Sequence, residues 1–109
     1  MALSTADAQK AVDDYCQSHE LPYWSPISQL AQLIEEVGEI ARIYNHKYGD
    51  KVKKPEESAD DLEGEMGDTL FALICMANVD GIDLGKALEK TMHKGRTRDK
   101  DRFAKKKPE

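Results

Sequence analysis

The chain contains one long amphipathic segment, PISQLAQLIEEVGEIARIYNHKYG, at residues 26–49. Ser25 followed by Pro26 is typical of a helix N-cap and a first helical position, where the missing N–H of proline costs nothing. Gly49 is typical of the residue just past the end of a helix. The sequence therefore predicts a helix that runs from Pro26 to about Tyr48.

Apolar residues recur every three or four positions along this segment, which predicts a stripe that faces a protein core. The stripe consists of Ile27, Leu30, Ile34, Val37, Ala41 and Tyr44. Leu33 and Ile40 widen it, so that the helix needs cover on more than one side. A small monomer has little material to provide that cover, and the pattern therefore favours self-association.

Three further helices are predicted, over residues 5–18, 58–80 and 84–94. Ser58 and Asp61 have the spacing of a capping box at the start of the second of these. Its predicted core stripe is Leu62, Met66, Leu70, Leu73 and Ala77. Because strand and hairpin patterns are nearly absent, the sequence predicts an all-α fold.

The length of 109 residues is that of one domain. We expect a single helical domain over residues 1–95 and a basic, partly ordered tail over residues 96–109. Residues 1–91 hold 18 acidic and 8 basic side chains, whereas residues 92–109 hold 3 and 8. This segregation argues against nucleic-acid binding over the whole surface. RNA contact by the tail alone is a weaker option.

Several sequence features favour a cytoplasmic protein. No segment approaches the length of about 20 apolar residues that a membrane span requires. The first residues lack the basic start and apolar stretch of a secretory signal. Cys16 and Cys75 have no C-x-x-C partner, so we expect both to be buried thiols in a reducing compartment.

Two pairs of carboxylates interrupt the apolar pattern. Glu36 and Glu39 are three residues apart, as are Glu65 and Asp68, so each pair lies on one face of its helix. Two unit charges 4 Å apart repel by about 4 kcal/mol at an effective dielectric constant of 20. Antiparallel packing of the two helices would bring the pairs together as hard oxygen ligands, which suit Mg²⁺ or Mn²⁺.

The residues alone leave a second interpretation open, in which these carboxylates belong to solvated helix faces. With 21 acidic residues in 109, pairs at this spacing arise by chance. A di-iron site requires Glu-x-x-His motifs, which are absent here. The spacing of an EF-hand is absent too. Among metals, magnesium is therefore favoured.

The acidic motifs also carry a family resemblance. LIEEVGE at residues 33–39, followed by EMGD at residues 65–68, resembles the E-x-x-E…E-x-x-D signature of MazG-type nucleotide pyrophosphohydrolases. ARIYNHKYG (41–49), GDTLFALICMAN (67–78) and MHKGRTRDKDRF (92–103) resemble the short, single-domain YpjD-type members. The resemblance implies a four-to-five-helix bundle, completed by dimerisation or tetramerisation, in which neighbouring subunits complete each active site.

The resemblance also implies an activity. Such enzymes cleave a nucleoside or deoxynucleoside triphosphate between its α- and β-phosphates, which releases a monophosphate and pyrophosphate and removes surplus or non-standard nucleotides. It implies that Glu36, Glu39, Glu65 and Asp68 are Mg²⁺ ligands, with Glu36 and Glu39 also acting in catalysis. Glu35 is a candidate for orienting the attacking water. A helix places it about 100° from Glu36, so an outer or surface role fits equally well.

Basic residues near the C-terminus are candidate phosphate contacts, because departing pyrophosphate needs cations beyond the metal. They are Lys90, Lys94, Arg96, Arg98 and Arg102. We favour Lys94 and Arg98, and expect Lys105–Lys107 to aid solubility. Gly95 departs from the asparagine that many relatives have after the lysine, which puts the local phosphate or sugar contact in question.

Three residues are candidates for contact with the base or sugar: Trp24, His46 and Asn78. Aromatic and imidazole rings can stack on a base, and an amide can hydrogen-bond to it. Each has an alternative, because Trp24 can anchor the loop before its helix and Asn78 can end a helix. For the whole chain the alternative function is a non-catalytic helical module that keeps the metal-binding bundle.

Overall fold

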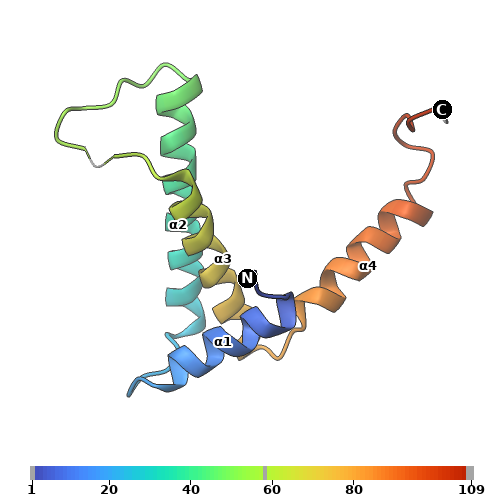
Figure 1. The fold of residues 1–109 in the computed structure, drawn as a ribbon, viewed down its shortest axis with the longest axis horizontal. Helices are drawn as coiled ribbons and strands as arrows, with labels where there is room; N and C mark the ends of the chain where they lie inside the picture. Colours follow the sequence, from blue (N-terminus) through green and yellow to red (C-terminus); the bar gives the residue numbers. More distant parts are fainter. Residues whose placement is uncertain (1, 58, 108–109) are drawn as a thin grey trace.

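The computed structural model describes residues 2–57 and 59–107 and contains four α-helices (Figure 1). These are α1 (Thr5–Gln17), α2 (Pro26–Tyr48), α3 (Leu62–Val79) and α4 (Leu84–Thr97). No strand occurs within the described residues. The predicted all-α fold class is thus confirmed, and among these residues no helix is both long and apolar enough to cross a membrane.

Side-chain caps fix the starts of the helices. Ser25 caps α2 by accepting a hydrogen bond from the Ser28 amide at 3.3 Å, and Pro26 occupies the first helical position as predicted. In α4, Asp83 accepts a hydrogen bond from the Lys86 amide at 3.0 Å. The bounds predicted for α2 are therefore confirmed.

The start predicted for α3 is wrong, since the helix begins at Leu62. Asp61 itself is the N-cap and accepts a hydrogen bond from the Gly64 amide at 2.9 Å. Its carboxylate thus satisfies a free amide of the first turn, and no residue upstream is needed for the cap. Ser58, the other member of the expected capping box, lies outside the described residues.

The fourth helix is longer than predicted, because it continues past Lys94 to Thr97. The amide of Arg98 donates to the carbonyl oxygen of Lys94 at 2.9 Å and closes the last turn. The helix therefore includes the first two residues of the expected tail. Gly95 is exposed and does not interrupt it.

α2 and α3 lie side by side and antiparallel, α1 crosses the end of this pair, and α4 projects away from it (Figure 1). Ala72, Cys75 and Ala77, the buried small residues of α3, take up little space, and Ile43 of α2 is buried as well. Tertiary hydrogen bonds add to the packing of α1, whose Gln9 bonds to Asn78 and to the carbonyl oxygen of Ile82.

The chain itself does not cover most of the apolar stripes predicted for α2 and α3, and whether another copy covers them stays a prediction. Most of their large side chains are exposed, namely Ile27, Leu30, Ile34, Val37 and Tyr44 on α2 and Met66, Leu70 and Leu73 on α3. The face of α2 that meets α3 instead contains Gln29, Leu33, Ile40 and Ile43. Because α2 is apolar on two sides, its periodicity cannot indicate which side the chain itself covers.

The arrangement is open. The radius of gyration is 17.9 Å, whereas a compact domain of this length has about 13 Å. The exposed stripes of α2 and α3 and the projecting α4 account for this difference.

Candidate functional site

Three carboxylates meet where α2 and α3 run side by side. Glu36 comes from α2, Glu65 and Asp68 from α3, and one carboxylate oxygen of each lies within 4.8 Å of the others. The antiparallel packing produces this meeting, because it places the middle of α2 against the first turns of α3. The geometry thus unites three of the four predicted metal ligands, whose role as ligands stays a prediction.

Glu39 is held outside this three-carboxylate cluster. Its carboxylate accepts a hydrogen bond from Nε of Arg42 at 3.0 Å. Nη1 of Arg42 also lies 3.4 Å from carboxylate oxygens of Glu57 and Asp60, in the connection before α3. The fourth predicted ligand therefore has a cationic partner in this structure.

Glu65 has the most perturbed environment in the cluster. Burial raises the pKa of Glu65 above its ordinary value, and the neighbouring carboxylates, Glu36 first, raise it further. Its Oε2 is buried and lacks a hydrogen-bond partner. An unpartnered carboxylate oxygen among other carboxylates is stabilised by a proton or a cation, so this donor set fits a hard divalent ion such as Mg²⁺ or Mn²⁺.

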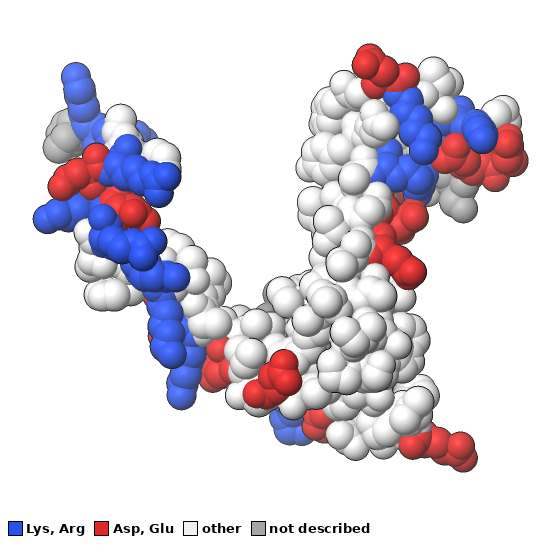
Figure 2. Space-filling view, turned by 180° about the vertical axis from the view of Figure 1, so that it is seen from behind, with Lys and Arg blue, Asp and Glu red and all other residues white. Residues whose placement is uncertain are grey.

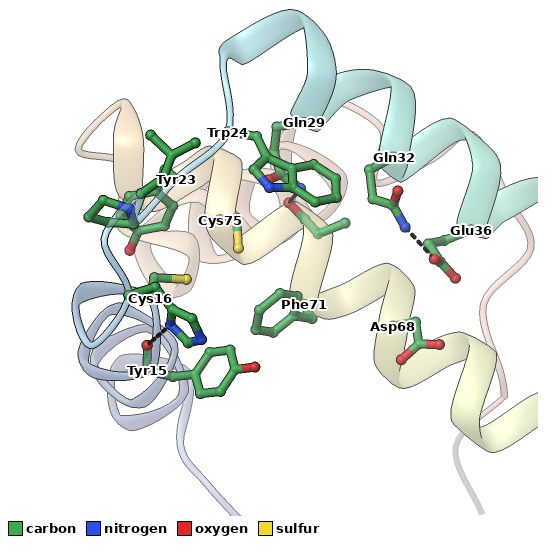
Figure 3. Close-up of a pocket in the computed structure, with 14 residues that line it drawn as sticks. Tyr15, Cys16, Tyr23, Trp24, Gln29, Gln32, Glu36, Asp68, Phe71 and Cys75 are labelled. Atoms are coloured by element: carbon green, nitrogen blue, oxygen red, sulfur yellow. Dashed lines mark hydrogen bonds between the residues drawn. The ribbon is translucent and has the colours of Figure 1, made fainter.

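Gln32 orients the ligand candidate on α2. Its Nε2 donates a hydrogen bond to Oε1 of Glu36 at 2.6 Å, one helical turn away (Figure 3). Both side chains are half-buried. Glu36 therefore has one oxygen engaged by a neutral donor.

A cavity of about 510 Å³ adjoins the cluster. Glu36 and Asp68 lie at one end of it, and the aromatic side chains of Trp24, Tyr15 and Phe71 line the remainder (Figure 3). Tyr15 and Phe71 contact edge to face, with ring centroids 6.0 Å apart. The site therefore joins a carboxylate end to an aromatic end, a combination suited to a ligand with a charged part and a flat apolar part.

Both cysteines line this cavity and are buried free thiols, as predicted. Burial raises the pKa of Cys75 to about 12, and Cys16 adds to this shift. Cys75 therefore stays protonated and serves as a small core residue rather than a nucleophile.

His46 does not line the cavity. Its imidazole, only 3% exposed, lies under the connection before α3. Nε2 is 3.5 Å from Glu57 and Nδ1 is 3.4 Å from Asp60. His46 therefore contacts this connection rather than the proposed ligand space.

Asn78 is likewise occupied by the protein itself. Its Oδ1 accepts from Nε2 of Gln9 at 3.0 Å, and its Nδ2 donates to the carbonyl oxygen of Gln9 and to the hydroxyl of Tyr23. Burial and a hydrogen bond to Asp13 raise the pKa of Tyr23 to about 12. This network joins α1, α3 and the loop before α2, and of the three predicted base contacts only Trp24 lines the cavity.

Sequence reasoning missed several residues that line the cavity: Tyr15, Phe71, Gln29 and Gln32. Tyr15 and Phe71 follow apolar helix patterns and therefore resemble core residues. The two glutamines carried a usable signal, because they lie on the same side of α2 as Glu36 among apolar neighbours.

The predicted phosphate contacts lie apart from the carboxylates. Lys90 and Lys94 line a shallow depression on α4 itself, and Arg96 and Arg98 are exposed. Figure 2 shows lysine and arginine side chains along much of the projecting α4 arm, with some acidic groups among them, apart from the α2–α3 arm. Arg102 is exposed as well, and none of the five lines the cavity. Glu35 is exposed on α2 beside Glu36.

Comparison with known proteins gives an independent result. Residues 24–103 match the family model of the MazG nucleotide pyrophosphohydrolase domain. YpjD of Bacillus subtilis (strain 168), an uncharacterized protein, is 47% identical over 100 residues, which cover 92% of this chain and 90% of YpjD.

Two solved structures share the fold. One is YpjD from Bacillus subtilis, provisionally described as a pyrophosphatase, with a TM-score of 0.79 and 42% identity over 89% of this chain and 99% of that one. The other is a Bacillus-conserved MazG protein described as a nucleotide pyrophosphohydrolase, with a TM-score of 0.76 and 44% identity over 92% of this chain and 97% of that one.

Proposed function

Because the chain belongs to the MazG nucleotide pyrophosphohydrolase family, we propose that it is a Mg²⁺-dependent nucleoside triphosphate pyrophosphohydrolase. It would cleave a ribo- or deoxyribonucleoside triphosphate between the α- and β-phosphates to a monophosphate and pyrophosphate. The observation that carries this proposal is the meeting of Glu36, Glu65 and Asp68 at one end of an aromatic cavity.

The carboxylates have a defined task in this reaction. Glu36, Glu65 and Asp68 would hold the divalent ion, and Glu39 would join them on leaving Arg42. When bound, Mg²⁺ (or Mn²⁺) supplies positive charge for phosphate oxygens and lowers the pKa of a bound water. Without that charge, the acidic cluster would repel a triphosphate, so substrate binding requires the ion.

The two ends of the cavity would determine the orientation in which the nucleotide binds. The phosphates belong at the end formed by Glu36 and Asp68, and the base at the aromatic end, where Trp24 offers a stacking surface. Glu35, one residue from Glu36 and exposed, stays a candidate for orienting the attacking water. Positioning and electrostatics then provide most of the rate enhancement.

The phosphate-binding cations would come from a second copy of the chain. Lys94 and Arg98 lie on an arm that does not reach the cavity of its own chain. The exposed apolar stripes of α2 and α3 need cover. A homodimer or tetramer meets both needs, with each α4 supplying positive charge to a neighbouring site. We propose that the enzyme works in the cytoplasm on surplus or non-standard nucleotides.

The direct test is hydrolysis of a panel of canonical, deoxy and modified triphosphates by the purified protein with Mg²⁺. Monophosphate and pyrophosphate are the expected products, whereas release of orthophosphate alone would contradict the proposal. Glu36→Gln should abolish activity with the fold intact, and Glu20→Gln, an exposed glutamate after α1, is the matched control. Metal binding without turnover of any triphosphate would favour the non-catalytic module.

A further inference from the structure

We propose that Gln32 is a positioning residue that sets the metal selectivity of the site, because it keeps Glu36 a one-oxygen ligand. The inference rests on the proposed metal-dependent function. It starts from the hydrogen bond of 2.6 Å between Gln32 Nε2 and Glu36 Oε1, within the cavity wall.

The geometry favours a fixed arrangement of these two side chains. They lie one turn apart on the face of α2 that meets α3, and both are half-buried. The hydrogen bond joins a neutral amide to a carboxylate, and such charge-assisted bonds are short and strong. Because a hydrogen-bond partner of a metal ligand fixes the orientation of that ligand, Gln32 would determine how Glu36 approaches an ion.

The neutral charge of Gln32 matters as much as its position. Glu39, the other acid of the motif, is held by the cationic Arg42, whose positive charge opposes a nearby divalent ion. An amide orients Glu36 without cancelling its charge. Gln32 therefore orients Glu36 by a hydrogen bond to Oε1 and leaves the negative charge of the carboxylate for a cation.

The hydrogen bond from Gln32 to one oxygen of Glu36 affects which metal ion the site prefers. Ca²⁺ takes six to eight oxygen ligands and often binds both oxygens of a carboxylate, whereas Mg²⁺ requires six in an octahedron and keeps several waters. The hydrogen bond from Gln32 uses one lone pair of Oε1 and fixes that oxygen toward Gln32, which disfavours binding of one ion by both oxygens of Glu36. The arrangement therefore favours the small octahedral ions Mg²⁺ and Mn²⁺ over Ca²⁺.

The test measures binding of Mn²⁺ and of Ca²⁺ by calorimetry to the nucleotide-free full chain. Gln32→Met keeps length and helix propensity but removes the donor. It should weaken Mn²⁺ binding by about 10-fold or more, the usual effect of removing the hydrogen-bond partner of a metal ligand, and weaken Ca²⁺ binding less. The ratio of the two affinities then moves toward Ca²⁺, a change that a purely structural role would not produce.

Two further variants make the result specific. Gln17→Met is the matched control, because Gln17 donates to Asp13 across the same spacing on α1, away from the cavity, and it should leave the ratio unchanged. Gln32→Glu adds a negative charge that strengthens attraction to both ions, yet it also removes the donor. It should therefore move the ratio in the same direction as Gln32→Met.

An unchanged ratio in a folded Gln32 variant, with folding checked by thermal melting, would overturn the role of Gln32 and leave the proposed function standing. If the wild-type chain bound neither ion, the proposed metal site would fail, and this inference with it. If Gln32→Met does not fold, Gln32→Glu decides the question by the same ratio.

Discussion

The guanidinium of Arg42 lies 3.0 Å from the carboxylate of Glu39, one turn earlier on α2. The same guanidinium reaches Glu57 and Asp60, so a candidate metal ligand is linked to the connection that leads into α3. Metal binding that recruits Glu39 would have to break this link. The connection and the metal site are therefore coupled through one side chain.

Arg42→Gln tests this coupling. We expect the metal-free variant to melt at a lower temperature than the wild type, because Glu39, Glu57 and Asp60 each lose one cationic contact. We expect Mn²⁺ to raise its melting temperature by more than it raises that of the wild type, because Glu39 is free and a competing positive charge is gone. Thermal melting with and without Mn²⁺ measures both effects.

Lys53→Gln is the control for this experiment, since Lys53 contacts Asp60 at 3.8 Å and does not reach Glu39. It should alter stability slightly and leave the response to Mn²⁺ unchanged. Equal responses of the Arg42 variant and the wild type would show that Glu39 takes no part in binding the ion.

Glu65 should make the stability of the metal-free protein depend on pH. The pKa of Glu65 is raised above its ordinary value of 4.5 in the folded state. At a pH between these two values, the folded protein therefore holds the proton of Glu65 more tightly than the unfolded chain does. The ionised carboxylate therefore destabilises the fold at pH 7, and this penalty disappears as the pH falls. Glu65→Gln should raise the melting temperature at pH 7 and change it little below pH 4.5, while it abolishes hydrolysis.

Glu63→Gln is a matched control for Glu65→Gln, because both residues are acidic and in the first turn of α3, but Glu63 is exposed and lies outside the cluster. Both variants lose a negative charge near the N-terminus of α3, so both lose the same kind of favourable interaction with the helix dipole. Equal shifts of the melting temperature in the two variants, followed in chelator from pH 4 to pH 8, would contradict a specific role for Glu65.

The fold class and most helix ends could be predicted from the sequence, because they depend on residues that are close together in the chain. Ser25 caps α2 in the structure and Pro26 occupies its first position, as the pattern predicts. The buried faces of the helices could not be predicted in the same way. An apolar stripe indicates that another surface covers it, but it does not indicate whether that surface belongs to the same chain. On α2, Leu33 and Ile40 face α3, whereas Ile34 and Val37 stay exposed.

The candidate site also has parts that could be predicted from the sequence and parts that could not. The meeting of Glu36 with Glu65 and Asp68 was one of two arrangements that the sequence left open, because i,i+3 spacing fixes the face shared by two acids but not what that face meets. The positions of His46 and Asn78 were not, because they depend on the course of the connection before α3 and on the crossing of α1. Those are long-range contacts that no short motif encodes.

Asn78 is expected to stabilise the fold without selecting the base. Asn78→Ala removes its hydrogen bonds to Gln9 and Tyr23 and leaves polar groups unpaired, which should cost about 2–3 kcal/mol of unfolding free energy. Denaturant unfolding measures this loss, and Gln17→Ala on the exposed side of α1 is the control. The relative kcat/KM values for different bases should stay the same. A changed order of substrates would instead make Asn78 a base contact.

Subunit complementation tests whether α4 serves a neighbouring copy. Glu36→Gln lacks a predicted metal ligand and Lys94→Gln lacks a predicted phosphate contact, so each alone should have little activity. If every site combines Glu36 of one chain with Lys94 of another, a mixed dimer contains one intact site. Refolding an equal mixture should then restore up to about a quarter of wild-type activity in the dimer case. No recovery would place both residues in the same chain's site.

The exposed stripe on α2 should be the surface through which copies associate. Ile34 and Val37 are 62% and 50% exposed, and burying one such side chain contributes about 1.5–3 kcal/mol. Ile34→Lys should therefore dissociate the assembly, as measured by sedimentation. Val52→Lys, at an 85% exposed apolar residue outside the stripe, should leave the assembly intact.

Because metal ligands and α4 cations would lie on separate molecules in the dissociated variant, Ile34→Lys should bind Mn²⁺ normally yet lose hydrolysis. A monomeric wild type with full activity would instead require α4 to fold back onto its own cavity.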